Sequence, residues 1–122
     1  MTDTNGKAAE SCSHRGLNQL ALGAAAEAVE SFRAAIAADP NYFEAHHGLI
    51  RALRDSGRLE QAIGAALALT ALTPDDPLAH TALSISLQQA GHIPEAEAAA
   101  AKARIVEWKA QLQSSPPTEH DS

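Results

Sequence analysis

The chain has one cysteine, four aromatic side chains and no run of lysine or arginine among its 122 residues. The lone Cys12 excludes an intramolecular disulfide framework and is typical of a reducing compartment. The formal net charge of −6 argues against nucleic acid as a partner, because a phosphate backbone needs a basic surface. These shortages exclude a disulfide-rich secreted domain and a nucleic-acid-binding domain.

Long apolar runs are scarce as well. The longest uncharged apolar stretch, Ala62–Leu72, has about half the length that a helix needs to cross a bilayer. The first residues, 1–7, lack the apolar segment of a secretion signal. We therefore expect a soluble, cytoplasmic protein that does not insert into membranes.

Alanine is the residue that the chain has in abundance, and it makes up about half of the 45% hydrophobic content. Alanine has the highest helix propensity but buries little area, so the bias favours helices over a thick core. Few β-branched runs occur, which leaves strands without support. The composition predicts an all-α fold of single-domain size, and the alanine content suggests a bacterial source.

The chain repeats itself at an interval of 34 residues, as Gly23, Gly57 and Gly91 show. Further positions keep the same interval: Ala28, Ala62 and Ala96, Pro40 and Pro74, His46 and His80, and Leu49 and Leu83. Each unit is predicted to contain a helix, a glycine turn, a second helix and a turn marked by proline. The glycine suits the left-handed position that ends a helix.

The glycine and proline residues of the second and third units predict where their helices begin and end. In the second unit, helices are expected over residues 43–56 and 59–72, with Gly57 between them. Asp76 is placed to cap the next helix, with Pro77 in its first turn. The last helix is expected from Pro94 to about Gln113, longer than the others, and would cap the array.

These residues resemble the tetratricopeptide repeat family, whose 34-residue motif keeps small residues, a bulky residue and a proline at fixed places in two helices. The resemblance covers about residues 9–110 and is carried by Gly16, Gly23, Ala28, Phe32, Ala35 and Pro40 in the first unit, Leu49, Gly57, Ala62 and Pro74 in the second, and Leu83, Gly91, Ala96 and Ala103 in the third. The sequence departs from the motif at Ile50, which replaces a small residue, at Gln19, where an aromatic residue is usual, and at Ala66 and Ala100, which replace the aromatic residue.

The resemblance implies an α-solenoid of three helix-turn-helix units that form a right-handed superhelix, with an extended C-terminal helix. The expected divisions are residues 1–8 as a flexible tail, 9–42, 43–76 and 77–110 as the three repeats with the last helix continuing to about 113, and 114–122 as a disordered tail.

The resemblance further implies a concave groove lined by the first helix of each unit, which receives a peptide or helix of a partner protein. By position the groove would contain Ser13, Leu17, Leu20, His47, Arg51, Arg54, Thr81, Ile85 and Gln88. His47, Arg51 and Arg54 share one helix face and could bind a carboxylate. Two readings of the arginines stay open: a binding feature, or side chains that are solvated or paired with nearby acids such as Asp55.

Candidate residues for catalysis or metal binding have simpler interpretations. His46 and His80 occupy equivalent places in successive repeats, where a packing role between helices is expected. Adjacent His46 and His47 diverge by about 100° around a helix, which disfavours a shared metal ion. Cys12 falls where a buried side chain of the first helix is expected, which favours a small hydrophobic residue over a nucleophile. We expect no enzyme, no metal and no cofactor.

The predicted function is therefore a protein-binding adaptor with another protein as its partner. Two alternatives remain open: a scaffold that assembles from further copies of the chain, and a secretion-type chaperone that holds a client protein. A clamp for the carboxyl terminus of general chaperones is not expected, because the residues at the matching positions lack the required Lys, Asn and Arg side chains. Those residues are Ser13, Leu17, Gly48, Leu78 and Ala82.

Overall fold

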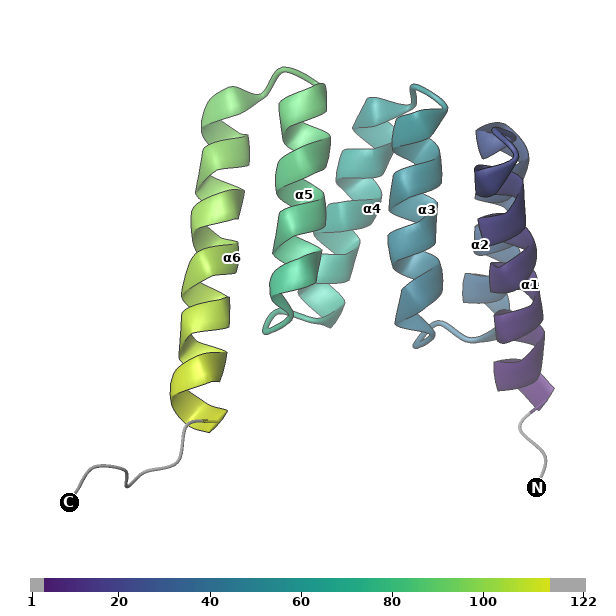
Figure 1. Cartoon of the computed structure of the whole chain (residues 1–122), viewed down its shortest axis with the longest axis horizontal. Coiled ribbons are helices and arrows are strands. Elements are labelled where there is room, and N and C mark those ends of the chain that lie inside the picture. Colours follow the sequence, from purple (N-terminus) through teal and green to yellow (C-terminus); the bar gives the residue numbers. More distant parts are fainter. Residues whose placement is uncertain (1–3, 115–122) are drawn as a thin grey trace.

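The computed structural model describes residues 4–114 and folds this part of the chain into six α-helices with no strand (Figure 1). The helices are α1 (Thr4–Ala21), α2 (Ala25–Ala38), α3 (Phe43–Asp55), α4 (Leu59–Leu72), α5 (Pro77–Gln89) and α6 (Ile93–Ser114). The predicted all-α fold is confirmed. Helix α1 begins at Thr4, so residues 4–8 are helical where a flexible tail was expected. The predicted C-terminal tail lies outside the described residues, apart from Ser114, which ends α6.

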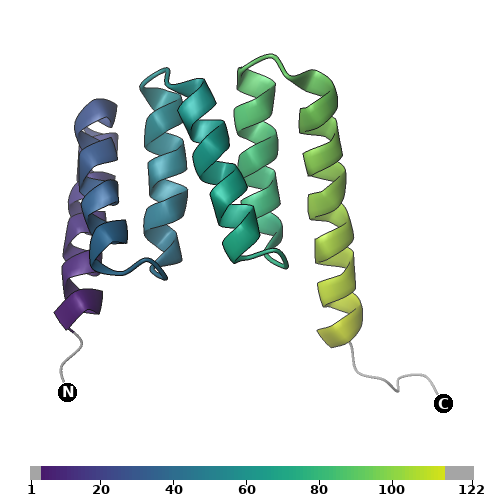
Figure 2. The ribbon, with the colours of Figure 1, turned by 180° about the vertical axis from the view of Figure 1, so that it is seen from behind.

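Successive helices pack as three antiparallel hairpins, and each hairpin also contacts the next. Helix α3 touches both α1 and α5, so the first helices of the three hairpins form a continuous row. Figure 1 shows this row in front of α2 and α4, and Figure 2 shows α2 and α4 from the other side. The arrangement is the stacked helical solenoid that the repeat period predicts.

The glycine turns have the conformation that the sequence predicts. Gly23, Gly57 and Gly91 have φ values of 80°, 80° and 89°, a region in which a Cβ would be strained. After each glycine, the next backbone N–H reaches back to a carbonyl five residues earlier: in the second turn Arg58 N donates to Leu53 O at 2.8 Å. This hydrogen bond satisfies a backbone carbonyl that the end of the helix would otherwise leave without a partner.

The proline turns differ from one another at the next helix start. Asp76 accepts a hydrogen bond from Leu78 N at 3.0 Å, and Pro77 occupies the first turn of α5, as predicted. Asp39 instead accepts from Asn41 N within its own turn, at 3.0 Å. Helix α3 therefore begins without a side-chain cap.

The largest buried side chain, Phe32, inserts its ring between α1 and α3. A Cβ atom built on Gly16 would lie 2.7 Å from the ring tip, and one built on Gly48 would lie closer still. Ordinary carbon contacts are about 3.5–4.0 Å, so only glycine fits at both places. The two glycines let one aromatic side chain from α2 fill the junction of three helices.

In the second unit the large side chain is on the first helix and the small one is on the second helix, the reverse of the first unit. Ile50 stands one repeat after Gly16, and Ala66 stands one repeat after Phe32. Both are buried, Ile50 to 1% exposure and Ala66 to 0%. The two departures from the family motif therefore compensate each other, because a large side chain on the first helix replaces the ring on the second.

The C-terminal end of the solenoid is polar at positions that are apolar in the first unit. Val29 and Ile63 are buried against neighbouring hairpins, whereas Glu97, one repeat later, is exposed on α6. Ile36 is partly buried, and its equivalent Arg104 is exposed. A charged outer face of this kind ends a repeat array, because no further hairpin covers it.

Candidate functional site

A pocket of about 410 Å³ lies between the first helices of the first two hairpins, α1 and α3. Its lining consists of Ser13, Leu17, Leu20, Glu44, His47, Gly48 and Arg51. The three α1 residues follow one helix face, since their spacing of four and three residues returns to the same side of a helix. The pocket therefore combines an apolar wall from α1 with a polar wall from α3.

Two apolar side chains of α1, Leu17 and Leu20, line this pocket. Leu17 is 49% exposed, and Leu20 is partly buried against the core. A single exposed leucine is common on protein surfaces, but here the exposed Leu17 lines the same cavity as the partly buried Leu20. The α1 wall can accept an apolar side chain from a ligand.

Ser13 lies at this wall and has a hydroxyl without a hydrogen-bond partner in the described part of the chain. The residue is 1% exposed, and its Oγ is fully buried. A buried hydroxyl left unpaired costs about 1–3 kcal/mol. A polar group of a ligand that reached into the pocket would remove that cost.

The polar wall carries both signs of charge. Arg51 Nε lies 3.5 Å from Asp55 Oδ2 in an exposed pair, and His47 Nε2 lies 3.8 Å from Asp76 Oδ2. Exposed pairs of this kind contribute about 0–1 kcal/mol, so a bound carboxylate could replace Asp55 at Arg51. Glu44 adds a negative charge beside them.

Glu44 also perturbs its neighbour Tyr42. The phenol of Tyr42 donates a hydrogen bond to Glu44 Oε1 at 3.1 Å. Partial burial, this hydrogen bond and the charges of Glu44 and Glu10 together raise the pKa of Tyr42 above its usual value. The phenol thus stays neutral and holds the Glu44 carboxylate at the rim of the pocket.

Five of the nine residues predicted for the groove line this one pocket: Ser13, Leu17, Leu20, His47 and Arg51. The other four are not among its lining. Arg54 is partly buried, with an Nε atom that has no partner in the described residues. On α5, Thr81 is exposed and Ile85 is half-buried, and Gln88 lines a separate cavity against α6.

Two lining residues, Glu44 and Gly48, were not predicted. Both could have been found from the sequence, because Glu44, His47, Gly48 and Arg51 are spaced by three or four residues on one face of α3.

The repeated histidines have the same structural role in two turns. His46 Nε2 donates to Pro40 O, and His80 Nε2 donates to Pro74 O, each at 2.8 Å. Each ring therefore ties a helix to the turn before it. Among residues 4–114, no group of three His, Cys, Asp or Glu side chains lies close enough to hold a metal ion.

Cys12 is partly buried against the core, with Arg15 Nη2 at 3.4 Å from its sulfur. No helix of the described chain is long and apolar enough to span a membrane.

Stacked helical hairpins with an open, mixed apolar and polar pocket on one row of helices define a repeat scaffold of the protein-binding class. A family model described as tetratricopeptide repeat matches residues 19–86, from the second half of α1 into α5. The chain belongs to the tetratricopeptide repeat family, whose repeats generally mediate protein–protein interaction. A comparison with curated proteins found no match to this chain.

Proposed function

We propose that the chain is a non-enzymatic adaptor that holds a peptide or helix of a partner protein on the row formed by α1, α3 and α5. The observation that carries this proposal is the pocket between α1 and α3, where Leu17 and Leu20 face Arg51. An apolar anchor in such a pocket, with a charged group at its rim, is the arrangement that concentrates binding energy in protein interfaces.

The recognised segment would place an apolar side chain against Leu17 and Leu20 and a carboxylate near Arg51. The hydroxyl of Ser13 would meet a polar group of the same segment. Thr81 and Ile85 extend the same row on α5 and would contact a longer ligand. The cytoplasm of a bacterium remains the proposed location, which agrees with the single Cys12.

Self-assembly is a weaker alternative for this structure. End-to-end stacking would bury Glu97 and Arg104, which are exposed on the last helix. Burying unpaired charges is costly, so the C-terminal end does not favour a second copy. A secretion-type chaperone would use the same pocket, and the nature of the captured partner would identify that role.

Affinity capture from the source organism, followed by mass spectrometry, tests the proposal. Leu17→Ser changes the pocket, and Leu22→Ser is the matched control, since Leu22 is 83% exposed and lies outside the pocket. We expect the wild-type and Leu22→Ser chains to capture the same partner, and the Leu17→Ser chain to lose it. Equal capture by all three chains would remove the pocket from the proposed function.

A further inference from the structure

A second groove lies between α4 and α6, with α5 as its floor, and it is separate from the α1–α3 pocket. Helices α4 and α6 do not contact each other, although both pack against α5. A cavity of about 480 Å³ occupies the upper part of this groove, and its lining is mainly apolar. That lining includes Ile63, Leu67, Leu83, Leu87, Ala98 and Ala99. Leu67 is 52% exposed at its edge.

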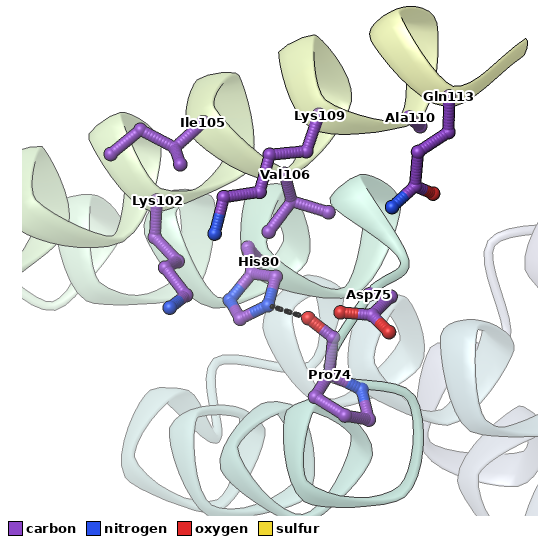
Figure 3. Close-up of a pocket in the computed structure, with 9 residues that line it drawn as sticks. All are labelled: Pro74, Asp75, His80, Lys102, Ile105, Val106, Lys109, Ala110 and Gln113. Atoms are coloured by element: carbon purple, nitrogen blue, oxygen red, sulfur yellow. Dashed lines mark hydrogen bonds between the residues drawn. The ribbon is translucent and has the colours of Figure 1, made fainter.

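The groove continues along α6 into a second cavity of about 230 Å³, and His80 and Lys102 line both cavities. The second cavity lies between the turn that contains Asp75 and the C-terminal half of α6. Figure 3 shows Lys102 and Lys109 extending from α6 toward the side of His80. An apolar half and a basic half thus follow each other in one groove.

Between the preceding hairpins, a side-chain bridge joins the two helices at the equivalent place. Arg33 Nη2 on α2 donates to Gln61 Oε1 on α4 at 3.3 Å. One repeat later these positions hold Leu67 and Glu95, which cannot form this bridge. The α4–α6 groove therefore lacks the side-chain bridge that joins α2 to α4.

The second cavity, which forms the basic half of the groove, has a charge that is unusual for this chain. Lys102 and Lys109 are seven residues apart on one face of α6, and neither forms an ion pair within residues 4–114. Asp75 is the acidic residue in that cavity, so the lysines outnumber it. In a protein with a net charge of −6, this local basic site favours an acidic ligand.

We propose that the α4–α6 groove is a second docking site, and that its occupant is an amphipathic helix of another protein with an apolar stripe followed by acidic residues. The apolar stripe would pack on Leu67, Leu83 and Leu87, and the acidic residues would pair with Lys102 and Lys109. A symmetric contact with a second copy is disfavoured, because both copies would bring the same pair of lysines into one interface.

Peptides from a phage-displayed library of about 16 residues, roughly four helical turns, provide the probe. The library is panned on the full chain, and the affinity of the recovered peptides is measured by fluorescence anisotropy. The first variant, Leu67→Arg with Glu95→Gln, places in the groove the residue pair that bridges α2 and α4. The second variant is Lys102→Glu with Lys109→Glu.

We expect recovered peptides with acidic and apolar residues that lose at least about tenfold in affinity for both variants, because the first variant places a bridge across the apolar half of the groove and the second removes the charged contacts. Replacing the acidic residues of the peptide by lysine should restore binding to the Lys102→Glu, Lys109→Glu chain. The control, Lys7→Glu with Arg104→Glu, makes the same change in net charge as the Lys102→Glu, Lys109→Glu variant, at exposed positions outside the groove, and should bind normally.

The Leu17→Ser chain should also bind these peptides normally, so failure of this proposal is distinct from failure of the α1–α3 proposal. The inference is overturned if no recovered peptide discriminates the groove variants from the control. It is overturned as well if removal of residues 115–122 raises peptide affinity tenfold, which would make the chain's own C-terminal segment the occupant. A wild-type dimer that dissociates in the groove variants would assign the groove to a second copy and contradict the proposal.

Discussion

The ring of Phe32 lies against the backbone of Gly48, at a distance that leaves no room for a Cβ atom. Phe32 has no exposed surface, and Gly16 confines its ring from the opposite helix. The position of α3 relative to α1 therefore depends on this contact. Because α1 and α3 are the two walls of the candidate pocket, the packing of Phe32 determines the width of the pocket.

Gly48→Ala is expected to destabilise the protein. Overpacking in a closed core lowers the free energy of unfolding by up to about 3 kcal/mol, and the higher helix propensity of alanine raises it by about 1 kcal/mol. The expected net loss of stability is therefore about 2 kcal/mol. Urea unfolding followed by circular dichroism measures the change. In a Phe32→Leu background the same substitution should cost less, since the smaller side chain leaves space. An equal cost in both backgrounds would show that the ring is not the cause.

Gly64→Ala is the matched substitution at an open site. Gly64 lies inside α4, and a Cβ added there would meet no atom within 4 Å. The substitution should therefore stabilise the protein by about 0.5–1 kcal/mol through backbone entropy. Loss of stability at this position would contradict the packing described for α4.

Ser13→Ala tests the unpaired hydroxyl in the candidate pocket. Removing a buried hydroxyl without a partner should raise the free energy of unfolding by about 1 kcal/mol. Ser86→Ala is the control, because Ser86 is also buried but donates to Ala82 O at 2.9 Å. We expect Ser13→Ala to be the more stable of the two variants in urea unfolding. The reverse order would indicate that Ser13 has a partner in the free protein.

Tyr42, the single tyrosine of the chain, allows a direct titration. Its raised pKa predicts that phenolate absorbance develops at a higher pH in the native chain than in the unfolded chain. Because the folded state retains its proton longer, the associated stability is complete below about pH 10 and is lost as pH rises through the folded pKa.

Glu44→Gln should lower the pKa of Tyr42 by removing a negative charge and a charged acceptor. Ultraviolet titration of the folded chain measures both values. Identical titration curves for the two chains would exclude Glu44 as a cause of the shift.

Arg51→Ala with Arg54→Ala is expected to weaken capture of the partner and to leave helicity unchanged. Arg51 is exposed and makes one exposed pair with Asp55, so its loss should cost little stability. Quantitative capture, with circular dichroism as the control for folding, measures the effect. Unchanged capture would support the interpretation of these arginines as solvated side chains.

The repeat architecture could be predicted from the sequence because glycine and proline mark each turn. The predicted helix 59–72 coincides with α4, and the last helix ends within one residue of the predicted Gln113. The start of α1 could not be placed in the same way. The position one repeat before Pro40 holds Gly6, so the proline that marks the later turns is missing there.

The candidate site was less accessible to prediction than the fold. Position in the repeat identified one face of α1 and one face of α3, but it could not show that those faces form a single pocket. The spacing of neighbouring helices depends on pairs of side chains from different helices. One such pair is Gly16 and Phe32 in the first unit, and its equivalent in the second unit is Ile50 and Ala66. In the same way, Arg33 on α2 forms a bridge to Gln61 on α4, whereas its equivalent Leu67 lines the groove between α4 and α6.

Photo-crosslinking from the pocket measures its contact with a partner most directly. A photoreactive amino acid is introduced at Leu17 in one chain and at Leu22 in another, and both chains are expressed in the source organism. The account predicts that the Leu17 chain forms a covalent adduct with another protein, and that the Leu22 chain forms little or none. Adducts of equal yield from both positions, or none from Leu17, would contradict it.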